Sequence, residues 1–165
     1  MSRMQRDPSA LLSNIARWFS GFGLLTMTVV IGWQVFARYV LNDSPAWSEQ
    51  AALLLMIWYV MFAAAAGVRE GFHIRIGVFA DALPGKAGKA VRIVGHSVVG
   101  LFGAGMAIWG TELVLATWSH VIPALGLPRG TAYIPIALSG LLILGFSIEW
   151  IVAEAGDREV EKTWS

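Results

Sequence analysis

The sequence predicts an all-α integral membrane protein with four transmembrane helices, folded as a single domain over residues 1–165. Four long apolar stretches carry this prediction, at about residues 18–41, 47–68, 93–118 and 131–153. About 20 apolar residues in a helix span a hydrocarbon core of about 30 Å, and a helix satisfies its own backbone hydrogen bonds in lipid. The composition agrees, because 56% of the residues are hydrophobic and only 14% are charged.

The first stretch is expected to remain as a membrane helix rather than to be removed as a signal peptide. Arg3, Arg6 and Arg17 precede it, which would suit a signal peptide. The apolar run is nevertheless longer than the usual apolar region of roughly 7–15 residues, and no A-x-A-like cleavage site follows it. Upstream, the helical spacing of Leu11, Leu12 and Ile15 predicts a short interfacial segment that leads into the helix.

The remaining elements follow from turn formers and from chain length. Pro45 disfavours helix at the residue before it, so the second helix should start close to Ala46. In the long connection from Arg69 to Arg92, the segment 74–83 is too apolar for a solvated loop and too short to span. It predicts an amphipathic segment in the membrane interface. Residues 119–130 contain two prolines and two glycines and predict a structured turn before the fourth helix.

The basic residues predict that both termini are cytoplasmic, since Lys and Arg favour that side of the membrane. Of the 12 basic residues, all but two fall in the N-terminal flank, the second-to-third connection and the C-terminal tail. The two exceptions lie on the outer side: Arg38 near the outer end of the first helix and Arg129 in the second outer connection. Tryptophans near the ends of the apolar runs are typical of the headgroup layer; they are Trp18, Trp47, Trp118 and Trp150.

Few polar residues inside the spans are candidates for chemistry. Arg38 and Glu49 match in depth across the first outer turn, which predicts an ion pair between them or with a partner subunit. Snorkelling of both side chains to the headgroups is the alternative. Glu112 and Glu149 are expected to be carboxylates at opposite interfaces rather than parts of a proton relay, because one lies in the outer half of the third span and the other in the inner half of the fourth.

Several functional classes are excluded or disfavoured. A formal net charge of +1 does not suggest a nucleic-acid partner, and the lack of cysteine excludes disulfides, iron–sulfur ligation and thiol catalysis. A bis-histidine haem needs two imidazoles at one depth on facing helices, but His73, His96 and His120 are scattered. The same scatter disfavours a metal site. We therefore expect no enzymatic activity and no cofactor in this chain.

Small residues predict where helices pack closely. The pairs Ala63–Gly67, Gly100–Ala104 and Gly103–Ala107 have the small-xxx-small spacing that lets helix backbones approach. The packing could be internal or against another subunit. Aromatic and methionine side chains crowd the second helix around Trp58, where they indicate either lipid contact or an adaptable surface for a partner helix.

Two motifs stand out by their residue pattern. The first, within residues 35–50, pairs an aromatic–x–Arg–Tyr run with Pro, Trp and an acidic start of the second helix. The second is an Arg, Gly, His, Arg run after the second helix. Their residues are Arg38, Tyr39, Pro45, Trp47, Glu49, Gln50, Arg69, His73 and Arg75. Both motifs resemble those of the small membrane subunit (DctQ-like, Q subunit) of tripartite ATP-independent periplasmic (TRAP) transporters. That family commonly has a second acid where this chain has Gln50, an amide that can hydrogen-bond but cannot serve as a second counter-charge.

The resemblance implies a non-catalytic scaffold in the bacterial inner membrane. Its partners would be a large elevator-type membrane subunit (M subunit), which holds the substrate and sodium sites, a periplasmic substrate-binding protein that delivers an organic acid anion, and membrane lipids. The motif residues would serve structural or subunit contacts. Two alternatives remain: a membrane-anchor subunit of a redox complex, which should bind haem, and a small self-contained exporter that acts as a dimer.

Overall fold

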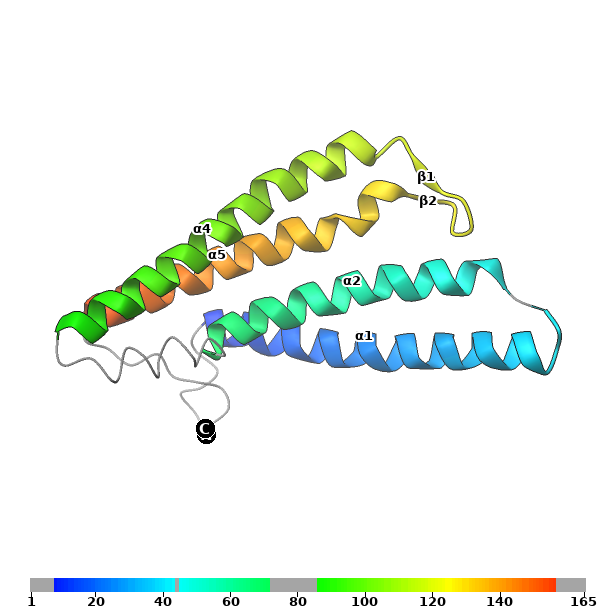
Figure 1. Ribbon diagram of the computed structural model, residues 1–165, viewed down its shortest axis with the longest axis horizontal. Helices are drawn as coiled ribbons and strands as arrows, with labels where there is room; N and C mark the ends of the chain where they lie inside the picture. Colours follow the sequence, from blue (N-terminus) through cyan, green and yellow to red (C-terminus); the bar gives the residue numbers. More distant parts are fainter. Residues whose placement is uncertain (1–7, 44, 72–85, 157–165) are drawn as a thin grey trace.

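The computed structural model describes residues 8–43, 45–71 and 86–156. In these ranges the chain forms four long helices, a short β-hairpin and one turn of 3₁₀ helix (Figure 1). Each helix is long and apolar enough to cross a membrane, which confirms the predicted fold class. The elements are α1 (Pro8–Tyr39), α2 (Ala46–Arg69), α4 (Lys86–Thr117), β1 (Val121–Ile122), β2 (Leu127–Pro128), η1 (Arg129–Ala132) and α5 (Ile134–Ala155).

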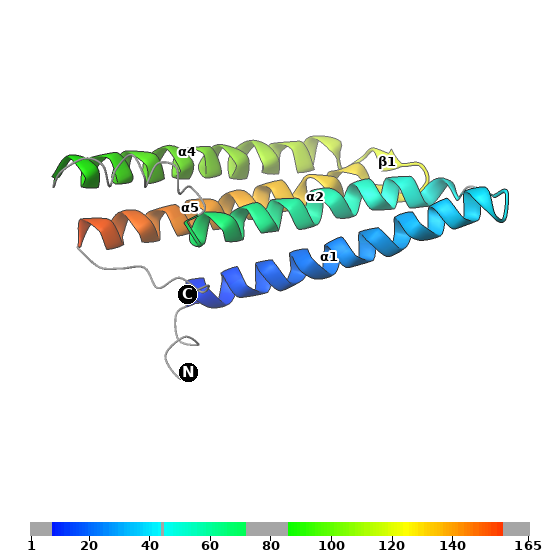
Figure 2. The same cartoon turned by 60° about the horizontal axis from the view of Figure 1, so that its bottom comes forward.

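The helices form a layer rather than a closed bundle. Two antiparallel pairs, α1–α2 and α4–α5, meet where α2 packs against α5. Figure 2 shows the resulting order α4, α5, α2, α1, with α4 and α1 at the two edges. We call the end where α1 begins and α5 ends the terminal end, and the end with the β-hairpin the hairpin end. In the described part of the chain, each helix exposes several large hydrophobic side chains.

Two helices begin earlier than the sequence predicted. The segment expected to be an interfacial lead-in is the start of α1, a continuous helix of 32 residues that begins at Pro8. Proline suits a first helical position because its missing N–H would have no partner there. Helix α4 begins at Lys86 instead of 93, and its basic first turns are held by ion pairing of Arg92 with Glu154 at 2.7 Å. The predicted interfacial segment 74–83 lies outside the described residues.

The connection at the hairpin end is structured, as its prolines and glycines suggested. β1 and β2 pair antiparallel, and Gly126 lies between them with a φ of 67°, a left-handed conformation that suits glycine. The Arg129 N–H donates to the His120 carbonyl oxygen at 2.6 Å and closes the loop. The 3₁₀ turn η1 then leads into α5, which starts at Ile134, three residues later than predicted.

The core is small and lies between α2 and α5, where Ala65, Val68, Ile143 and Phe146 are buried together. The α4–α5 seam depends on glycine. A Cβ on Gly140 would lie 2.6 Å from the Ala107 nitrogen and 2.7 Å from the Gly103 oxygen, and both are backbone atoms. These two helices therefore touch backbone to backbone.

The predicted packing residues on α4 are more buried than those on α2. On α4, Gly100 and Gly103 are buried, and Ala104 and Ala107 are half-buried, with Gly100, Gly103 and Ala107 directly on α5. On α2, Ala63 is exposed and Gly67 half-buried, so close packing at this pair, against another subunit, stays a prediction. The buried alanines of α2 are Ala52, Ala65 and Ala66. Spacing alone did not identify the buried face of α2, because four consecutive alanines offer several such pairs.

Candidate functional site

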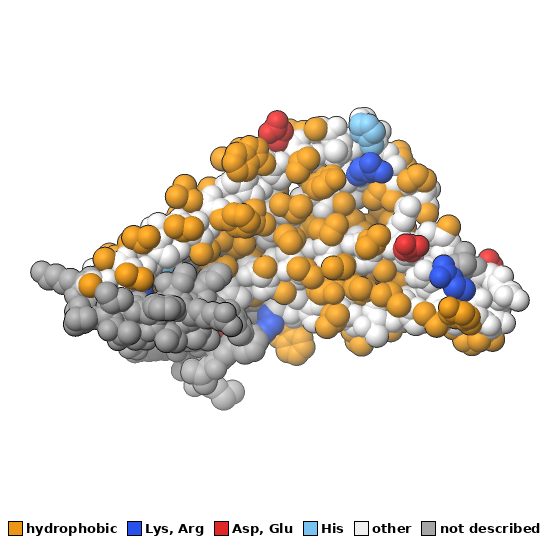
Figure 3. Space-filling model, viewed as in Figure 1, with side chains coloured by type: hydrophobic (Ala, Val, Ile, Leu, Met, Phe, Trp, Pro, Cys, Tyr) orange, Lys and Arg blue, Asp and Glu red, His pale blue; other side chains and the backbone are white. Residues whose placement is uncertain are grey.

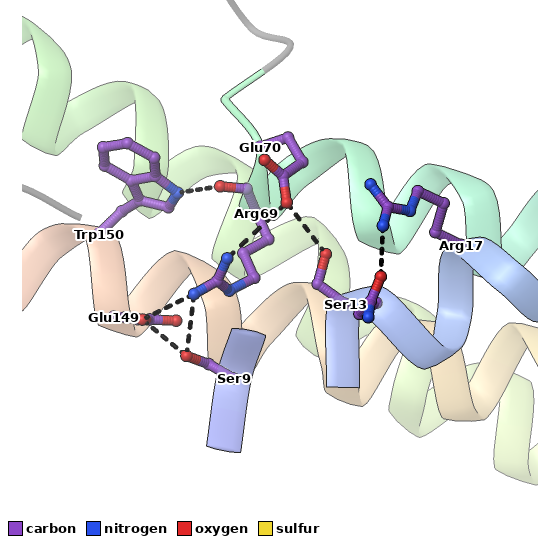
Figure 4. A network of polar contacts seen from close by, with 8 residues as sticks. Ser9, Ser13, Arg17, Arg69, Glu70, Glu149 and Trp150 are labelled. Atoms are coloured by element: carbon purple, nitrogen blue, oxygen red, sulfur yellow. Dashed lines mark hydrogen bonds and ion pairs between the residues drawn. The ribbon is translucent and has the colours of Figure 1, made fainter. Parts of the chain in front are cut away.

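A buried ion-pair network lies at the terminal end and is centred on Arg69, the last residue of α2 (Figure 4). Its side chain is only 1% exposed. Arg69 Nη1 lies 3.7 Å from Glu70 Oε1, and Nη2 lies 3.9 Å from Glu149 Oε1 on α5. A guanidinium so far from water needs counter-charges, and these two carboxylates provide them.

Two serines on α1 complete this network. The Ser9 hydroxyl donates to Glu149 Oε1 at 2.8 Å and accepts a hydrogen bond from Arg69 Nη2 at 3.3 Å. One turn further on, the Ser13 hydroxyl donates to Glu70 Oε1 at 3.3 Å. Both serines face the same side of α1 because they are four positions apart. The beginning of α1 is thereby tied to the end of α2 and to α5.

Helix α4 is joined to the same end through Trp150. The indole Nε1 donates to the Arg69 carbonyl oxygen at 3.1 Å, one of the carbonyls that a helix end leaves without an intrahelical partner. The Trp150 ring stacks on His96 of α4, with ring centroids 5.2 Å apart and an interplanar angle of 4°. All four helices are therefore connected within a short distance of Arg69.

A second charged region lies at the hairpin end, in a groove of about 320 Å³ between α1 and α2. Arg38 and Glu49 stand at its mouth, and both residues are exposed. The groove brings together the two residues that we expected to pair by depth, and the ion pair itself stays a prediction. Its lining is completed by Met27, Ile31, Gln34, Ala52 and Leu53.

The other residues of the first motif build the turn and connect the two helix pairs. Pro45 is the N-cap residue of α2, and its carbonyl oxygen accepts a hydrogen bond from the Ser48 hydroxyl at 2.7 Å. Gln50 Oε1 accepts a hydrogen bond from the Ala124 N–H in the β-hairpin at 3.3 Å. This contact needs an acceptor and no charge, which an amide supplies. Tyr39 and Trp47 are exposed at the surface.

Sequence reasoning placed Arg69 in a motif but missed most of its partners. Ser9, Glu70 and Trp150 were not singled out as its partners, nor Ser13 as a partner of Glu70, and Glu149 was expected to be a simple interface carboxylate. It is an ion-pair partner of Arg69, although its side chain keeps 31% exposure. The available signal was Glu70 beside Arg69, with two serines four positions apart on α1. His73 and Arg75, the rest of the second motif, lie outside the described residues.

The described histidines and carboxylates do not gather into a metal site. Within residues 8–43, 45–71 and 86–156 no three His, Cys, Asp or Glu side chains gather as metal ligands do. His96 is stacked on Trp150, while His120 and Glu112 are exposed at and near the hairpin end. The network holds helices together, and the groove presents two opposite charges above an apolar floor.

These features define a multi-pass membrane protein whose buried polar residues hold its own helices together. The family model described as "Tripartite ATP-independent periplasmic transporters, DctQ component" matches residues 27–155. That range is most of the chain, and the chain belongs to this family of TRAP transporter small permease subunits. The resemblance seen in the two motifs is thereby confirmed.

Three relatives illustrate the range of the family. The sialic acid TRAP transporter small permease protein SiaQ of Vibrio cholerae is 31% identical over 77 residues, which are 47% of this chain and 44% of that protein. The C4-dicarboxylate TRAP transporter small permease protein DctQ of Rhodobacter capsulatus is 29% identical over 99 residues, 59% of this chain and 44% of that protein. The chain thus aligns with less than half the length of these two relatives. The ectoine TRAP transporter small permease protein TeaB of Halomonas elongata is 27% identical over 137 residues, 82% of this chain and 70% of that protein.

Proposed function

We propose that this chain is the non-catalytic scaffold subunit of a TRAP transporter in the bacterial inner membrane. The observation that carries the proposal is the single layer of four helices, tied together at the terminal end by the Arg69 network (Figures 2 and 4). A layer leaves large apolar faces for lipid and for a partner, as the hydrophobic side chains spread over the helices in Figure 3 illustrate. A closed bundle would hide much of that area.

The scaffold would hold the fixed part of the large membrane subunit while the transport domain moves. An elevator mechanism needs a part that does not tilt, and long helices locked at one end resist tilting. Helix α1 contributes because its 32 residues exceed a simple perpendicular span. Sodium and substrate would bind the large subunit, and a periplasmic protein would deliver the organic acid anion.

The contact face for the large subunit is proposed on α1 and α2. An apolar pocket of about 210 Å³ lies there, lined mainly by large side chains: Leu12, Ile15, Ala16, Phe19, Trp58, Phe62 and Leu142. Phe19 packs edge-on against Phe62, with ring centroids 5.2 Å apart. Such a pocket suits an inserted apolar side chain from a neighbouring helix. The aromatic surface of α2 is thus interpreted as a partner surface.

The proposed orientation has the terminal end in the cytoplasm. Arg17, Lys89 and Arg92 lie toward that end, where basic groups meet the anionic inner leaflet. The hairpin end would then face the periplasm and the docked binding protein. Cysteine labelling at Asp43 and at Ala155 with a membrane-impermeant reagent tests the orientation: Asp43→Cys should react in intact cells and Ala155→Cys only after permeabilisation.

Co-purification tests the function. The tagged chain is expressed together with its neighbouring large membrane protein and purified in mild detergent. A one-to-one complex that transports an organic acid with sodium only when the periplasmic protein is present is the expected result. A chain that purifies alone and transports by itself would support an exporter, and a haem spectrum would support a redox anchor; either would overturn the proposal.

A further inference from the structure

The groove between α1 and α2 has the layout of a phospholipid site. Its walls come from one face of each helix: Met27, Ile31, Gln34 and Arg38 repeat at helical spacing on α1, and Glu49, Ala52 and Leu53 repeat on α2. Both charges stand at the mouth. Apart from Gln34, the deeper lining is apolar. A surface groove with charged residues at one end and apolar residues along its length matches an amphiphilic molecule better than a wholly apolar helix.

The length of the groove fits one leaflet. Met27 and Arg38 are eleven positions apart, a distance of about 16 Å along a helix. Half of a hydrocarbon core of about 30 Å is nearly the same length. An acyl chain lying along Met27, Ile31 and Leu53 would therefore reach from the headgroup layer to the middle of the bilayer.

The polar residues follow the order of polar groups in a phospholipid. Arg38, at the mouth, is suited to a phosphate, which a guanidinium binds through two parallel hydrogen bonds. Glu49 stands on the facing helix and is suited to a primary ammonium group. Gln34 lies one turn deeper than Arg38, at the level of the ester carbonyls, to which its amide can donate.

We propose that this groove binds a zwitterionic phospholipid with a primary amine in its headgroup, of the phosphatidylethanolamine class. Arg38 binds the phosphate and Glu49 binds the ammonium. A choline headgroup has no N–H to donate, and a glycerol headgroup has no positive charge. The opposite charges at the mouth therefore select ethanolamine over both. This assignment is independent of the scaffold role proposed above.

The test uses the full-length chain in mild detergent, together with any subunit that co-purifies. Native mass spectrometry would titrate dioleoyl phosphatidylethanolamine, phosphatidylcholine and phosphatidylglycerol. We expect ethanolamine lipid to bind roughly tenfold more tightly than the other two, because a hydrogen bond between charged groups is added. Glu49→Gln should lose this preference, whereas Glu112→Gln, which changes an exposed carboxylate on α4, should keep it.

Four further variants separate lipid binding from folding. Arg38→Gln should weaken all three lipids, and Arg38→Lys should restore much of the binding. Leu53→Trp fills the groove without changing any charge and should also weaken all three, while Leu138→Trp, at an exposed position of α5, should have no effect. Equal affinity for the three lipids, or the same lipid profile in the Glu49 and Glu112 variants, would overturn the proposal. So would unchanged binding in Leu53→Trp.

Discussion

The two ends of this helix layer carry similar charged residues, but in different environments. At the terminal end an arginine that ends α2 faces the carboxylate of the next residue and one from α5, and its side chain is 1% exposed. At the hairpin end an arginine in the last turn of α1 shares a groove with a carboxylate in the first turn of α2, and both residues are exposed. Residue type does not distinguish these regions, whereas burial does.

Burial decides what each set of charges can do. A buried charge loses hydration, so its partners must all stay in place, and removal of one leaves the others uncompensated. An exposed pair contributes little to folding, since water and salt screen it. The terminal end is therefore expected to determine stability. The hairpin end exposes its charges at the surface.

The largest expected effect comes from removing the charge at the centre of the network. Arg69→Met leaves Glu70 and Glu149 without their shared counter-charge. We expect a loss of about 3–5 kcal/mol in unfolding free energy, the usual cost of breaking a buried ion pair. Tryptophan fluorescence during denaturant unfolding in detergent measures it. Arg69→Lys keeps the charge but not the planar donor geometry, and it should lose less.

A variant at the other end provides the control for this change. Arg38→Met removes the same kind of side chain from an exposed position. Its unfolding free energy should stay within about 0.5 kcal/mol of the parent chain. Equal losses in the two variants would contradict the distinction between a structural end and an accessible one.

A substitution in the seam between α4 and α5 should have the next largest effect on stability. Gly140→Ala places a methyl group 2.6 Å from the Ala107 nitrogen, so the helices must separate, at a cost of about 1–3 kcal/mol. A methyl group on Gly145, in the same helix, would meet nothing within 4 Å, and Gly145→Ala should stabilise by about 0.5–1 kcal/mol through lower chain entropy. Thermal unfolding of the two variants should therefore shift in opposite directions.

Much of this fold could be predicted from the sequence, because lipid imposes simple rules. Four apolar stretches of sufficient length had to be helices, and the loop at the hairpin end had to be a turn. The start of α1 could not be predicted so well. Hydropathy fades before Trp18, but the helix continues to Pro8 because Ser9 and Ser13 find partners on other helices. A hydropathy profile does not detect hydrogen bonds between helices.

The candidate sites show the same limit more clearly. Arg38 and Glu49 could be paired from the sequence because a short turn places them at one depth. Arg69 and Glu149 are 80 positions apart in the chain, and their contact depends on how α2 packs against α5. The sequence specifies the depth of each residue well. The direction in which it points around a helix depends on packing, and in α2 four consecutive alanines leave that direction open.

The same substitution at both ends sharpens the comparison. Glu149→Gln removes the charge that faces Arg69 but keeps an oxygen that can accept from Ser9, so about 1–2 kcal/mol should be lost, less than for Arg69→Met. Glu49→Gln should change unfolding free energy by less than about 0.5 kcal/mol. Denaturant unfolding of both proteins in one detergent measures the difference. A larger loss in the Glu49 variant would show that the hairpin end is the structural one.

The smallest expected effect concerns Gln50, where the family commonly has an acid. Its side-chain oxygen accepts from the Ala124 N–H and so joins α2 to the β-hairpin. Gln50→Leu removes the acceptor and should cost about 0.5–1.5 kcal/mol locally, whereas Gln50→Glu keeps an acceptor and should cost less. The hydrogen-exchange rate of the Ala124 amide measures this contact directly. It should rise in the leucine variant and stay unchanged in the glutamate variant. If both variants exchange like the parent chain, the hairpin is held by its backbone pairing alone, and the difference from the family pattern at this position has no structural consequence.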